Sequence, residues 1–465
     1  MFIKKFVLRA AGASLAAIVL LTTQQLRAES SSDTARIEKL ERAVELLAKQ
    51  NAELQAEIKS LKKETASVPD GKFKKKVTYD GKTYVEKAVV EEEKPPVYVQ
   101  QRGPELKLVL GGFIQMNFED GDVSAFEGRF GQTALKDRFR LRRARINLTG
   151  DFAEQFDFKL EGDFENSDGI NANRTAFEAT DIFINWHQFP WAQIKMGQWK
   201  APFGLEQLTP DTSLYIIERS LPTGAITPER QIGVQLWGKP LATVWPEQKD
   251  LLTYYAGIFN GNGRNITNND NNNFMYVGRL ESTLFKSKMW GESYLKLGAD
   301  VLNSRDDAGT NISQSLTLKV NSDGSLSPFT LPTAAERTAW SVDAWLRLGR
   351  FDLIGEYLEE YVNGRTVNGV PGMPDFTTNG YYITAGYFLI PKKLQLAVQW
   401  QDLNPGQRGS DGIHSITGGL NYYIHGDDIK LMVNYIHTWS DFREAHPEFG
   451  KDDFDEVIGR VQVMF

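Results

Sequence analysis

From Leu106 to Phe465 the chain alternates apolar and polar residues with a period of two. One face of each alternating run is apolar and the other is polar, as in residues 144–149, 156–164, 394–401 and 415–424. Successive side chains of a β-strand point to opposite faces of a sheet, so this period indicates strands rather than helices. The pattern predicts an all-β domain over residues 106–465.

Three features favour a transmembrane barrel over a soluble β-sandwich, which also alternates. The candidate strands are about ten to twelve residues long, which suits a tilted membrane crossing. Their connections alternate strictly between short turns and long loops, and Val457–Phe465 forms an amphipathic strand that ends on an aromatic ring. We therefore expect an antiparallel barrel of about sixteen strands, which encloses an aqueous channel and has both ends of the barrel chain on the periplasmic side.

One connection, which includes Gly197–Ser220, is much longer than a turn. It lies between an alternating run and the next one, Arg230–Gly238, and it contains Leu205, Leu208 and the apolar patch Leu214–Ile217. A connection of about thirty residues is uncommon in a compact domain unless it has a function. We expect this loop to pack its apolar residues on the inner wall, to turn its polar groups to the channel and to narrow the pore.

Residues 1–28 have the features of a signal peptide. Lys4 and Lys5 precede an apolar core around Ala10–Leu21, and Leu26-Arg27-Ala28 follows that core. The core is about a dozen residues long, whereas a helix needs about 20 residues to span a bilayer, which disfavours an uncleaved anchor. We expect export from the cytoplasm.

The sequence pattern predicts an α-helical coiled coil over residues 33–63 and a linker over residues 64–105. The heptad seam of the helix consists of Ile37, Leu40, Val44, Leu47, Asn51, Leu54, Ile58 and Leu61. A buried Asn at this kind of position favours a two-stranded coil. Within the linker, Asp80-Gly81 lies between short β-rich runs and predicts a small hairpin over Val77–Val85.

Composition narrows the chemistry. The net charge of -7 argues against nucleic-acid binding, and the mean hydropathy of -0.38 suits a barrel because lumen-facing residues lower the average. The chain has no Cys and 5 His, so we expect no disulfide, no metal centre and no cofactor. His414 and Ser415 are adjacent on one strand and point to opposite faces, which argues against a Ser/His/acid set and an enzyme.

The densest basic cluster lies on the second predicted barrel strand, between residues 138 and 145. With the apolar side chains of residues 144–148 turned to lipid, Arg143 and Arg145 point into the lumen, while Arg142 faces outward or lies at the outer rim. An arginine at the bilayer midplane costs about 2–4 kcal/mol, so the opposite register is disfavoured. Two interpretations stay open: an anion-attracting wall, or pairing with lumen acids such as Asp157, Glu161 and Asp163.

The other charges of the predicted lumen are mixed in sign. Wall cations such as Lys195 are offset by wall acids, and in the long loop Lys200 and Arg219 are offset by acids that include Asp211 and Glu218. Charge counting predicts a water-filled channel with weak or local selectivity.

Several ordered segments of the chain resemble the phosphate-selective porin O and P family of outer-membrane channels. The resemblance covers Leu106–Phe465 and rests on these segments: LKLVLGGFIQ (Leu106–Gln115), FRLRRARINLTG (Phe139–Gly150), GQWKAPFGLE (Gly197–Glu206), ERSL (Glu218–Leu221) and RVQVMF (Arg460–Phe465). It implies a barrel of sixteen strands (about the number counted above), a trimer as the usual assembly, and a third loop folded inward. The trimer differs from the two-stranded coil that Asn51 favours.

The resemblance also implies which residues line the anion path. Arg142 and Arg143 match the arginine pair of the family's second strand, and Arg219 matches the arginine of ERSL. Gln207 stands where phosphate-specific members have a lysine after FGLE, and Phe113 stands where they have an arginine after the first-strand GG. The outer arginine ladder of the family has no counterpart in Asn303–Arg337. The resemblance therefore implies a barrel and a pore for this chain, but it does not imply phosphate specificity.

The sequence thus predicts an outer-membrane porin for passive diffusion of small hydrophilic solutes, with an anion preference. The residues expected on the anion path are Arg142, Arg143, Arg145, Lys195, Lys200, Gln207 and Arg219. The expected partners are outer-membrane lipid, small anions and further copies of the chain. The alternative function is a structural anchor, in which the periplasmic coiled coil reaches peptidoglycan or another periplasmic partner.

Overall fold

The computed structural model describes residues 73–79, 84–90, 97–98, 106–122, 137–164, 177–288, 291–310, 318–369 and 371–465. The chain divides into two units, Met1–Lys94 and Pro95–Phe465. The predicted signal peptide (residues 1–28), the predicted coiled coil (residues 33–63) and most of the linker lie outside the described residues. In the first unit β1 (Phe73–Tyr79) pairs antiparallel with β2 (Tyr84–Val90), from Phe73 opposite Val90 to Tyr79 opposite Tyr84. The predicted hairpin is therefore confirmed.

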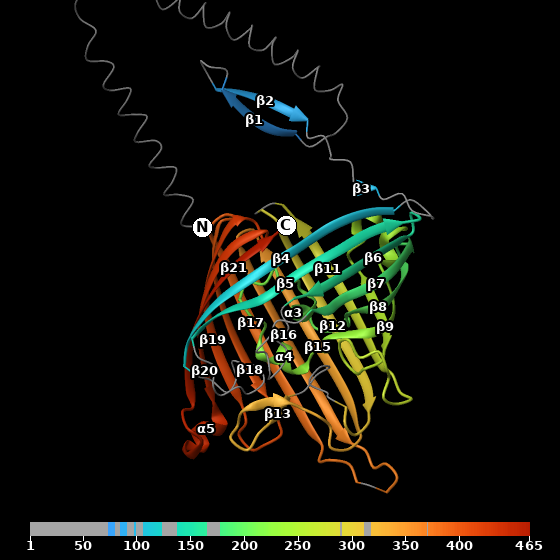
Figure 1. The fold of residues 1–465 in the computed structure, drawn as a ribbon, viewed down its shortest axis with the longest axis vertical. Helices are drawn as coiled ribbons and strands as arrows, with labels where there is room; N and C mark the ends of the chain where they lie inside the picture. The colour runs from blue at the N-terminus through green and yellow to red at the C-terminus, as the bar shows by residue number, and fades with distance from the viewer. Residues whose placement is uncertain are drawn as a thin grey trace, which may run out of the picture. The chain divides into compact units, whose positions relative to one another are not determined.

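The second unit is a closed barrel of sixteen antiparallel strands, as predicted (Figure 1). The first nine strands are β4 (Leu106–Gly121), β5 (Arg138–Phe152), β6 (Phe156–Asp163), β7 (Glu178–Phe189), β8 (Ala192–Lys200), β9 (Arg230–Gly238), β10 (Thr253–Phe259), β11 (Met275–Ser287) and β12 (Ser293–Asp306). The other seven are β15 (Ala335–Leu348), β16 (Phe351–Gly364), β17 (Phe376–Ile390), β18 (Leu394–Asn404), β19 (Ile413–His425), β20 (Ile429–Ser440) and β21 (Asp453–Met464). A two-residue strand, β3 (Val97–Tyr98), also pairs with β4.

The barrel closes where its last strand pairs with its first. β21 pairs antiparallel with β4, and the backbone N–H and carbonyl of Phe465 both bond to Gly112 at 3.0 Å. A Cβ on Gly112 would lie 2.4 Å from the Arg145 carbonyl oxygen and 2.8 Å from the Phe465 ring. The GG of the first strand therefore lets the terminal aromatic ring lie against the closing seam.

Burial confirms the two faces that the alternation predicts. On β19, Ser415, Thr417 and Asn421 are buried inside, while Ile416 and Leu420 are exposed on the outside. The same holds on β18, where Gln395 and Gln399 are buried and Leu396 and Val398 are exposed. The outer surface of the strands is thus apolar and the lumen is polar, which is the arrangement that a barrel in lipid requires.

The connections are short at one end of the barrel and long at the other, with one exception. The exception joins β9 to β10 over residues 239–252 at the short-turn end and contains two 3-10 helices, η1 (Pro240–Ala242) and η2 (Pro246–Gln248). The prediction of strict alternation is wrong here, because residues 239–252 fold into a compact turn with two 3-10 helices instead of a tight turn of a few residues. Asp250 holds this turn together by bonding both Lys239 and Lys286.

The long-loop end carries further small elements (Figure 1). They are the hairpin of β13 (Leu318–Val320) and β14 (Leu326–Pro328), the helix α5 (Asp441–Ala445) and the 3-10 helix η4 (Pro447–Phe449). Among the residues that the structure describes, no helix is long and apolar enough to span a membrane.

Candidate functional site

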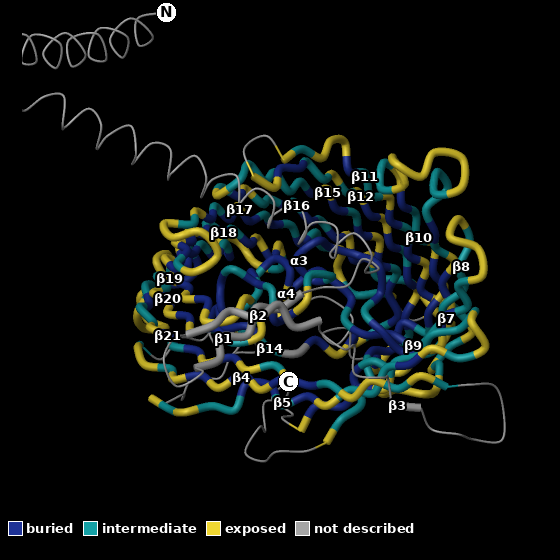
Figure 2. The backbone as a smooth tube through the Cα atoms, turned by 90° about the horizontal axis from the view of Figure 1, so that it is seen from above, coloured by how far each residue is buried: buried dark blue, intermediate teal, exposed yellow. Residues whose placement is uncertain are grey.

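The connection between β8 and β9 lies inside the ring of strands, as predicted (Figure 2). This inward loop, residues 201–229, contains α3 (Leu205–Leu208) and α4 (Leu221–Ile226). α4 begins where the sequence places a capping residue before a proline: the Ser220 hydroxyl accepts a bond from the Thr223 N–H, and Pro222 lies in the first turn.

Lumen-facing side chains of four strands hold the backbone of the inward loop. Gly204 N–H donates to Asp300 Oδ2 at 3.0 Å, and Leu205 N–H donates to Glu356 Oε1 at 2.8 Å. Further along, Ile217 N–H donates to Asn434 Oδ1 at 2.7 Å and Leu221 N–H donates to Gln401 Oε1 at 2.6 Å. A buried backbone donor without an acceptor costs about 1–3 kcal/mol, so each of these bonds fixes the loop.

Apolar side chains also attach the loop to the wall. Phe203, Ala225 and Ile226 belong to a buried apolar cluster with Phe259 and other wall residues. Ile217 packs with Met432 and Ile458 in a second cluster. The predicted packing of the patch Leu214–Ile217 is confirmed for Leu214, Ile216 and Ile217, which are buried.

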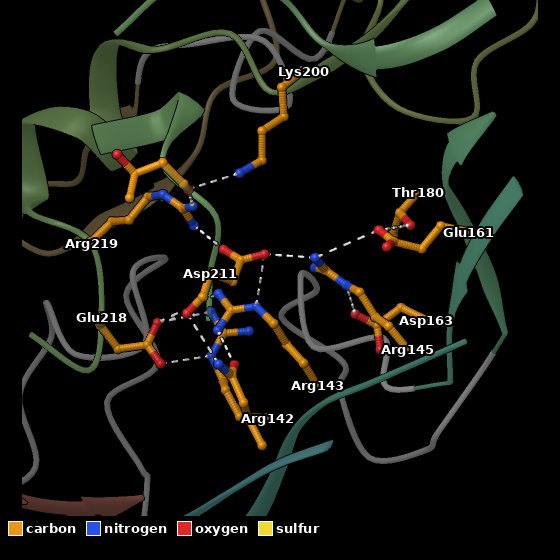
Figure 3. Close-up of polar contacts among 12 residues, drawn as sticks. Arg142, Arg143, Arg145, Glu161, Asp163, Thr180, Lys200, Asp211, Glu218 and Arg219 are labelled. Atoms are coloured by element: carbon orange, nitrogen blue, oxygen red, sulfur yellow. Dashed lines mark hydrogen bonds and ion pairs between the residues drawn. The ribbon is translucent and has the colours of Figure 1, made fainter. Parts of the chain in front are cut away.

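Asp211 is the centre of a buried charge cluster between the loop and β5 (Figure 3). Its Oδ2 accepts a bond from Arg145 Nη1 at 2.6 Å, its Oδ1 bonds Arg219, and Arg143 Nε lies 3.6 Å away. Burial alone would raise the pKa of Asp211, but Arg143 and Arg219 beside it hold that pKa well below its usual range. The carboxylate is therefore ionised and occupies the position between these arginines.

Glu218 has the same role a few residues later in the loop. It accepts two bonds from Arg142, at 2.9 and 3.0 Å, and one from Arg460 of β21 at 2.5 Å. The paired N–H groups of a guanidinium match the two oxygens of a carboxylate, so such a contact is strong and directional. Glu218 thus joins β5 and β21, the two strands that flank β4, to the loop.

Arg142 points into the lumen, and the prediction that it faces outward or lies at the outer rim is wrong. The reason is a β-bulge: Gln115 pairs with Arg143 and Met116 pairs with Leu141, so Arg142 is an extra residue without a partner on β4. A bulge breaks the alternation at one position, so two consecutive side chains lie on the same face. The predicted inward orientation of Arg143 and Arg145 is confirmed, since both are buried against the loop.

Of the two interpretations of the arginine strand, an anion-attracting wall or pairing with lumen acids, the contacts support pairing. Arg145 Nε donates to Asp163 Oδ2 at 2.7 Å, and Glu161 lies 3.9 Å from Arg145 Nη1. Phe113, at the position where the family has an arginine, lies under the Arg145 guanidinium at 5.4 Å. The guanidinium donors of β5 are therefore used within the protein.

Two predicted site residues hold the loop instead of facing an open channel. Lys200 Nζ donates to the carbonyl oxygen of Gln207 at 2.7 Å. Arg219 donates to the carbonyl oxygens of Thr209, at 2.7 Å, and Glu206, at 3.0 Å. Gln207 itself is buried on α3. These contacts give the loop its internal shape.

Lys195 lies apart from that cluster, on β8, and is surrounded by aromatic rings. Its Nζ is 4.3 Å from the centre of the Phe183 ring, 5.7 Å from Trp199 and 5.9 Å from Trp237. Lys296 on β12 has a similar setting, 5.2 Å from Tyr294 and 5.5 Å from Trp345. Within the described part of the chain neither lysine forms a salt bridge or a hydrogen bond.

A group of three buried acids, Asp300, Asp343 and Glu356, has the spacing of metal ligands. Arg279 Nη1 lies 2.8 Å from Asp300 Oδ2 and 2.7 Å from Asp343 Oδ2. Asp300 and Glu356 also accept the backbone bonds of the inward loop described above. The oxygens of this group thus accept bonds from the Arg279 guanidinium and from backbone N–H groups of the loop, so the group anchors the loop.

Sequence reasoning missed the acceptors that hold the loop, namely Asp300, Glu356, Gln401 and Asn434. Their only sequence signal is a polar residue at a lumen-facing position, which many other residues share. It also treated Asp211 and Glu218 as charges that offset the loop cations, without placing them between arginines of distant strands.

Comparison with known proteins agrees with this architecture. The family described as "Phosphate-selective porin O and P" matches residues 113–465. Among solved structures, an anion-selective porin from Comamonas acidovorans aligns with a TM-score of 0.50 and 14% identity, covering 78% of this chain and 100% of that one. OmpT, an outer-membrane protein of Vibrio cholerae solved in a trimer form, aligns with a TM-score of 0.50 and 9% identity, covering 77% and 99%. A search of curated proteins gave no match.

Proposed function

The chain belongs to the phosphate-selective porin O and P family, and we propose that it forms a water-filled channel for passive diffusion of small hydrophilic solutes, with a preference for anions. The outer membrane is the location of this family of channels. The observation that carries the proposal is the closed barrel with a polar lumen and a loop fixed inside it. Sixteen strands enclose more space than their own side chains fill, so the loop sets the width of the path.

The anion preference has two sources in this proposal. The first is the wall of Lys195 and Lys296, whose ammonium groups form no salt bridge or hydrogen bond among the described residues. The second is the field of the arginine cluster, where arginines from β5, β21 and the loop share the carboxylates of Asp211 and Glu218. The guanidinium donors are buried and occupied, so they attract anions at a distance without binding them.

Phosphate has no special site in this proposal. Gln207 and Phe113 stand where phosphate-specific relatives place cations, and Asp211 fills the space between Arg143, Arg145 and Arg219. Phosphate and chloride should therefore compete weakly, in contrast with a channel that binds phosphate between its arginines.

Planar-bilayer recording tests the proposal. Purified protein should give step-like conductance in KCl, a reversal potential on the anion side across a KCl gradient, and a chloride current that phosphate does not block at submillimolar concentration. Folded protein without conductance would contradict the channel, a cation-side reversal potential would contradict the anion preference, and saturable phosphate block would contradict the absence of a phosphate site.

We also propose a homotrimer, because a structure with the same fold is described as a trimer. The anchor function stays a second proposal that rests on the heptads of residues 33–63. Deleting residues 30–105 should leave conductance unchanged and weaken retention of the outer membrane on isolated cell wall. Unchanged retention would contradict the anchor.

A further inference from the structure

A cavity of about 540 Å³ opens on the inner wall at the short-turn end of β6 to β9. Its lining includes Asp157, Phe183, Asn185, Gln193, Lys195 and Trp237. This volume lies in the range of small-molecule sites, about 300–1,000 Å³. The lining combines the rings of Phe183 and Trp237 with polar and charged side chains, which also include His187.

The Lys195 ammonium is a positive charge whose donors are free. The rings of Phe183, Trp199 and Trp237 lie within 6 Å of its nitrogen and stabilise the charge through their electron-rich faces without accepting a conventional hydrogen bond. An ammonium group has three N–H donors. Since no described acceptor uses them, they are available to an anion that enters the cavity.

The Trp237 ring is held in one orientation before any ligand arrives. Its indole N–H donates to Asn185 Oδ1 at 3.0 Å, and Asn185 Nδ2 donates to Asp157 Oδ2 at 2.8 Å and to Gln193 Oε1 at 3.1 Å. The Tyr255 ring of β10 stacks on Trp237, with 6.0 Å between centres and 6° between planes. Both rings stay partly accessible in the lumen. The wall therefore presents a fixed aromatic surface next to a free cation.

We propose that this cavity binds small cyclic monocarboxylates, with the carboxylate on Lys195 Nζ and the ring against Trp237. A flat or ring-shaped body suits the aromatic surface, because rings pack favourably on one another in offset or edge-to-face geometry. One carboxylate fits better than two, because Asp157 lines the same cavity and repels a second negative group. The proposal rests on the chain being an open channel, and it names a class of solute that the channel favours.

Solute block of the KCl current in planar bilayers tests the site. Benzoate is the probe, acetate has the charge without the ring, and benzyl alcohol has the ring without the charge. Benzoate should half-block at a concentration about three- to tenfold lower than acetate, and benzyl alcohol should not block. A benzene dicarboxylate should block less than benzoate. Equal block by benzoate and acetate, or stronger block by the dicarboxylate, would overturn the proposal while the KCl conductance itself still supports the channel.

Variants locate the block. Lys195→Met should remove benzoate block, and Trp237→Leu should reduce it to the acetate level. Lys296→Met is the matched control, because it removes an unpartnered lysine from the same wall outside the cavity, and it should keep the preference for benzoate over acetate. The assignment would be overturned if the preference for benzoate over acetate survived Trp237→Leu. It would also be overturned if Lys296→Met abolished that preference as fully as Trp237→Leu does, because the site would then lie elsewhere. The wild-type solute comparison stands even where a variant fails to fold.

Discussion

Two walls of the lumen carry positive charge in different states. On the arginine wall, β5 faces the inward loop, and Arg142, Arg143 and Arg145 are buried with Asp211 or Glu218 between them. On the lysine wall, Lys195 and Lys296 are partly accessible and lie on aromatic rings, and neither forms a salt bridge in the described part of the chain. The first wall holds the loop, and the second wall is open to solutes.

The difference shows that a dense run of cationic residues is a poor guide to where an anion binds. A buried guanidinium must have a carboxylate close by, because an unpaired buried charge costs several kcal/mol. The protein supplies that partner from its own loop, so the donors are no longer available. An isolated lysine on an aromatic surface keeps both its charge and its donors.

The largest effect should follow from removing the shared carboxylate of the arginine wall. Asp211→Asn leaves Arg143, Arg145 and Arg219 without their common partner, and breaking a buried ion pair costs about 3–5 kcal/mol. The free energy of unfolding, measured by urea denaturation in detergent micelles, should fall by about that amount. Asp151→Asn, an exposed change on β5, should leave it unchanged. Equal stability of the two variants would show that Asp211 does not hold the loop.

A smaller loss of stability should follow from Arg142→Gln. The bulge places this side chain on Glu218, and hydrogen bonds to charged groups contribute about 1.5–3 kcal/mol to folding. Arg138→Gln is the control on the same strand, since Arg138 is partly exposed and pairs with Glu119 near the outer edge, where ion pairs contribute about 0–1 kcal/mol. If the two variants lose the same stability, Arg142 does not act through the bulge.

A still smaller effect is expected from Gln207→Lys. The added charge stands where phosphate-specific relatives have a lysine, so anion selectivity should rise, by less than about threefold because Gln207 is buried. The measurement is the reversal potential across a KCl gradient. A fall in anion selectivity would show that the new ammonium group displaces Lys200 or Arg219 from the loop instead of facing the path.

The smallest effect is expected from pH. The folded-state pKa of Asp211 lies well below its usual value, because Arg143 and Arg219 outweigh the effect of burial. The contribution of such a carboxylate to stability is complete above its unfolded pKa of about 3.9 and is lost only as pH falls through the lower folded pKa. The contribution of Asp211 to holding the loop should therefore stay constant between about pH 8 and pH 5, so no step of conductance in that range should depend on Asp211. A step within that range that Asp211→Asn abolishes would contradict the low pKa.

Much of the barrel could be predicted from the sequence. Side chains of a strand alternate between two faces, and the face towards lipid must be apolar, so the alternation assigns each strand residue to the lipid or to the lumen. Ile416 and Ser415, or Leu396 and Gln395, lie on the predicted faces for this reason. The inward loop was also predictable, from its length and its apolar patch. Residues 1–28 and 33–63 lie outside the described part of the chain, so the signal peptide and the coiled coil stay predictions.

The site was harder to predict, because it depends on positions where local rules fail or where distant segments meet. Arg142 was assigned to the wrong face because a bulge adds one residue without any mark in the alternation. Asp211 meets Arg145 across 66 positions of sequence, and no local pattern shows that pairing. The aromatic setting of Lys195 depends on Phe183, Trp199 and Trp237 from three strands, and only the registers of β7, β8 and β9 bring these rings together.

The measurement that tests the account most directly is the reversal potential of Lys195→Met/Lys296→Met beside the wild type across a KCl gradient. A unit charge about 6 Å from an ion in water changes its energy by about 0.7 kcal/mol, or about threefold in local concentration. Each lysine should therefore change the ratio of anion to cation permeability about tenfold, because it raises anions about threefold and lowers cations about threefold, and the double variant should lose at least that factor with an unchanged free energy of unfolding. An unchanged permeability ratio in a folded, conducting double variant would contradict the account, because the anion preference would then belong to the arginine wall.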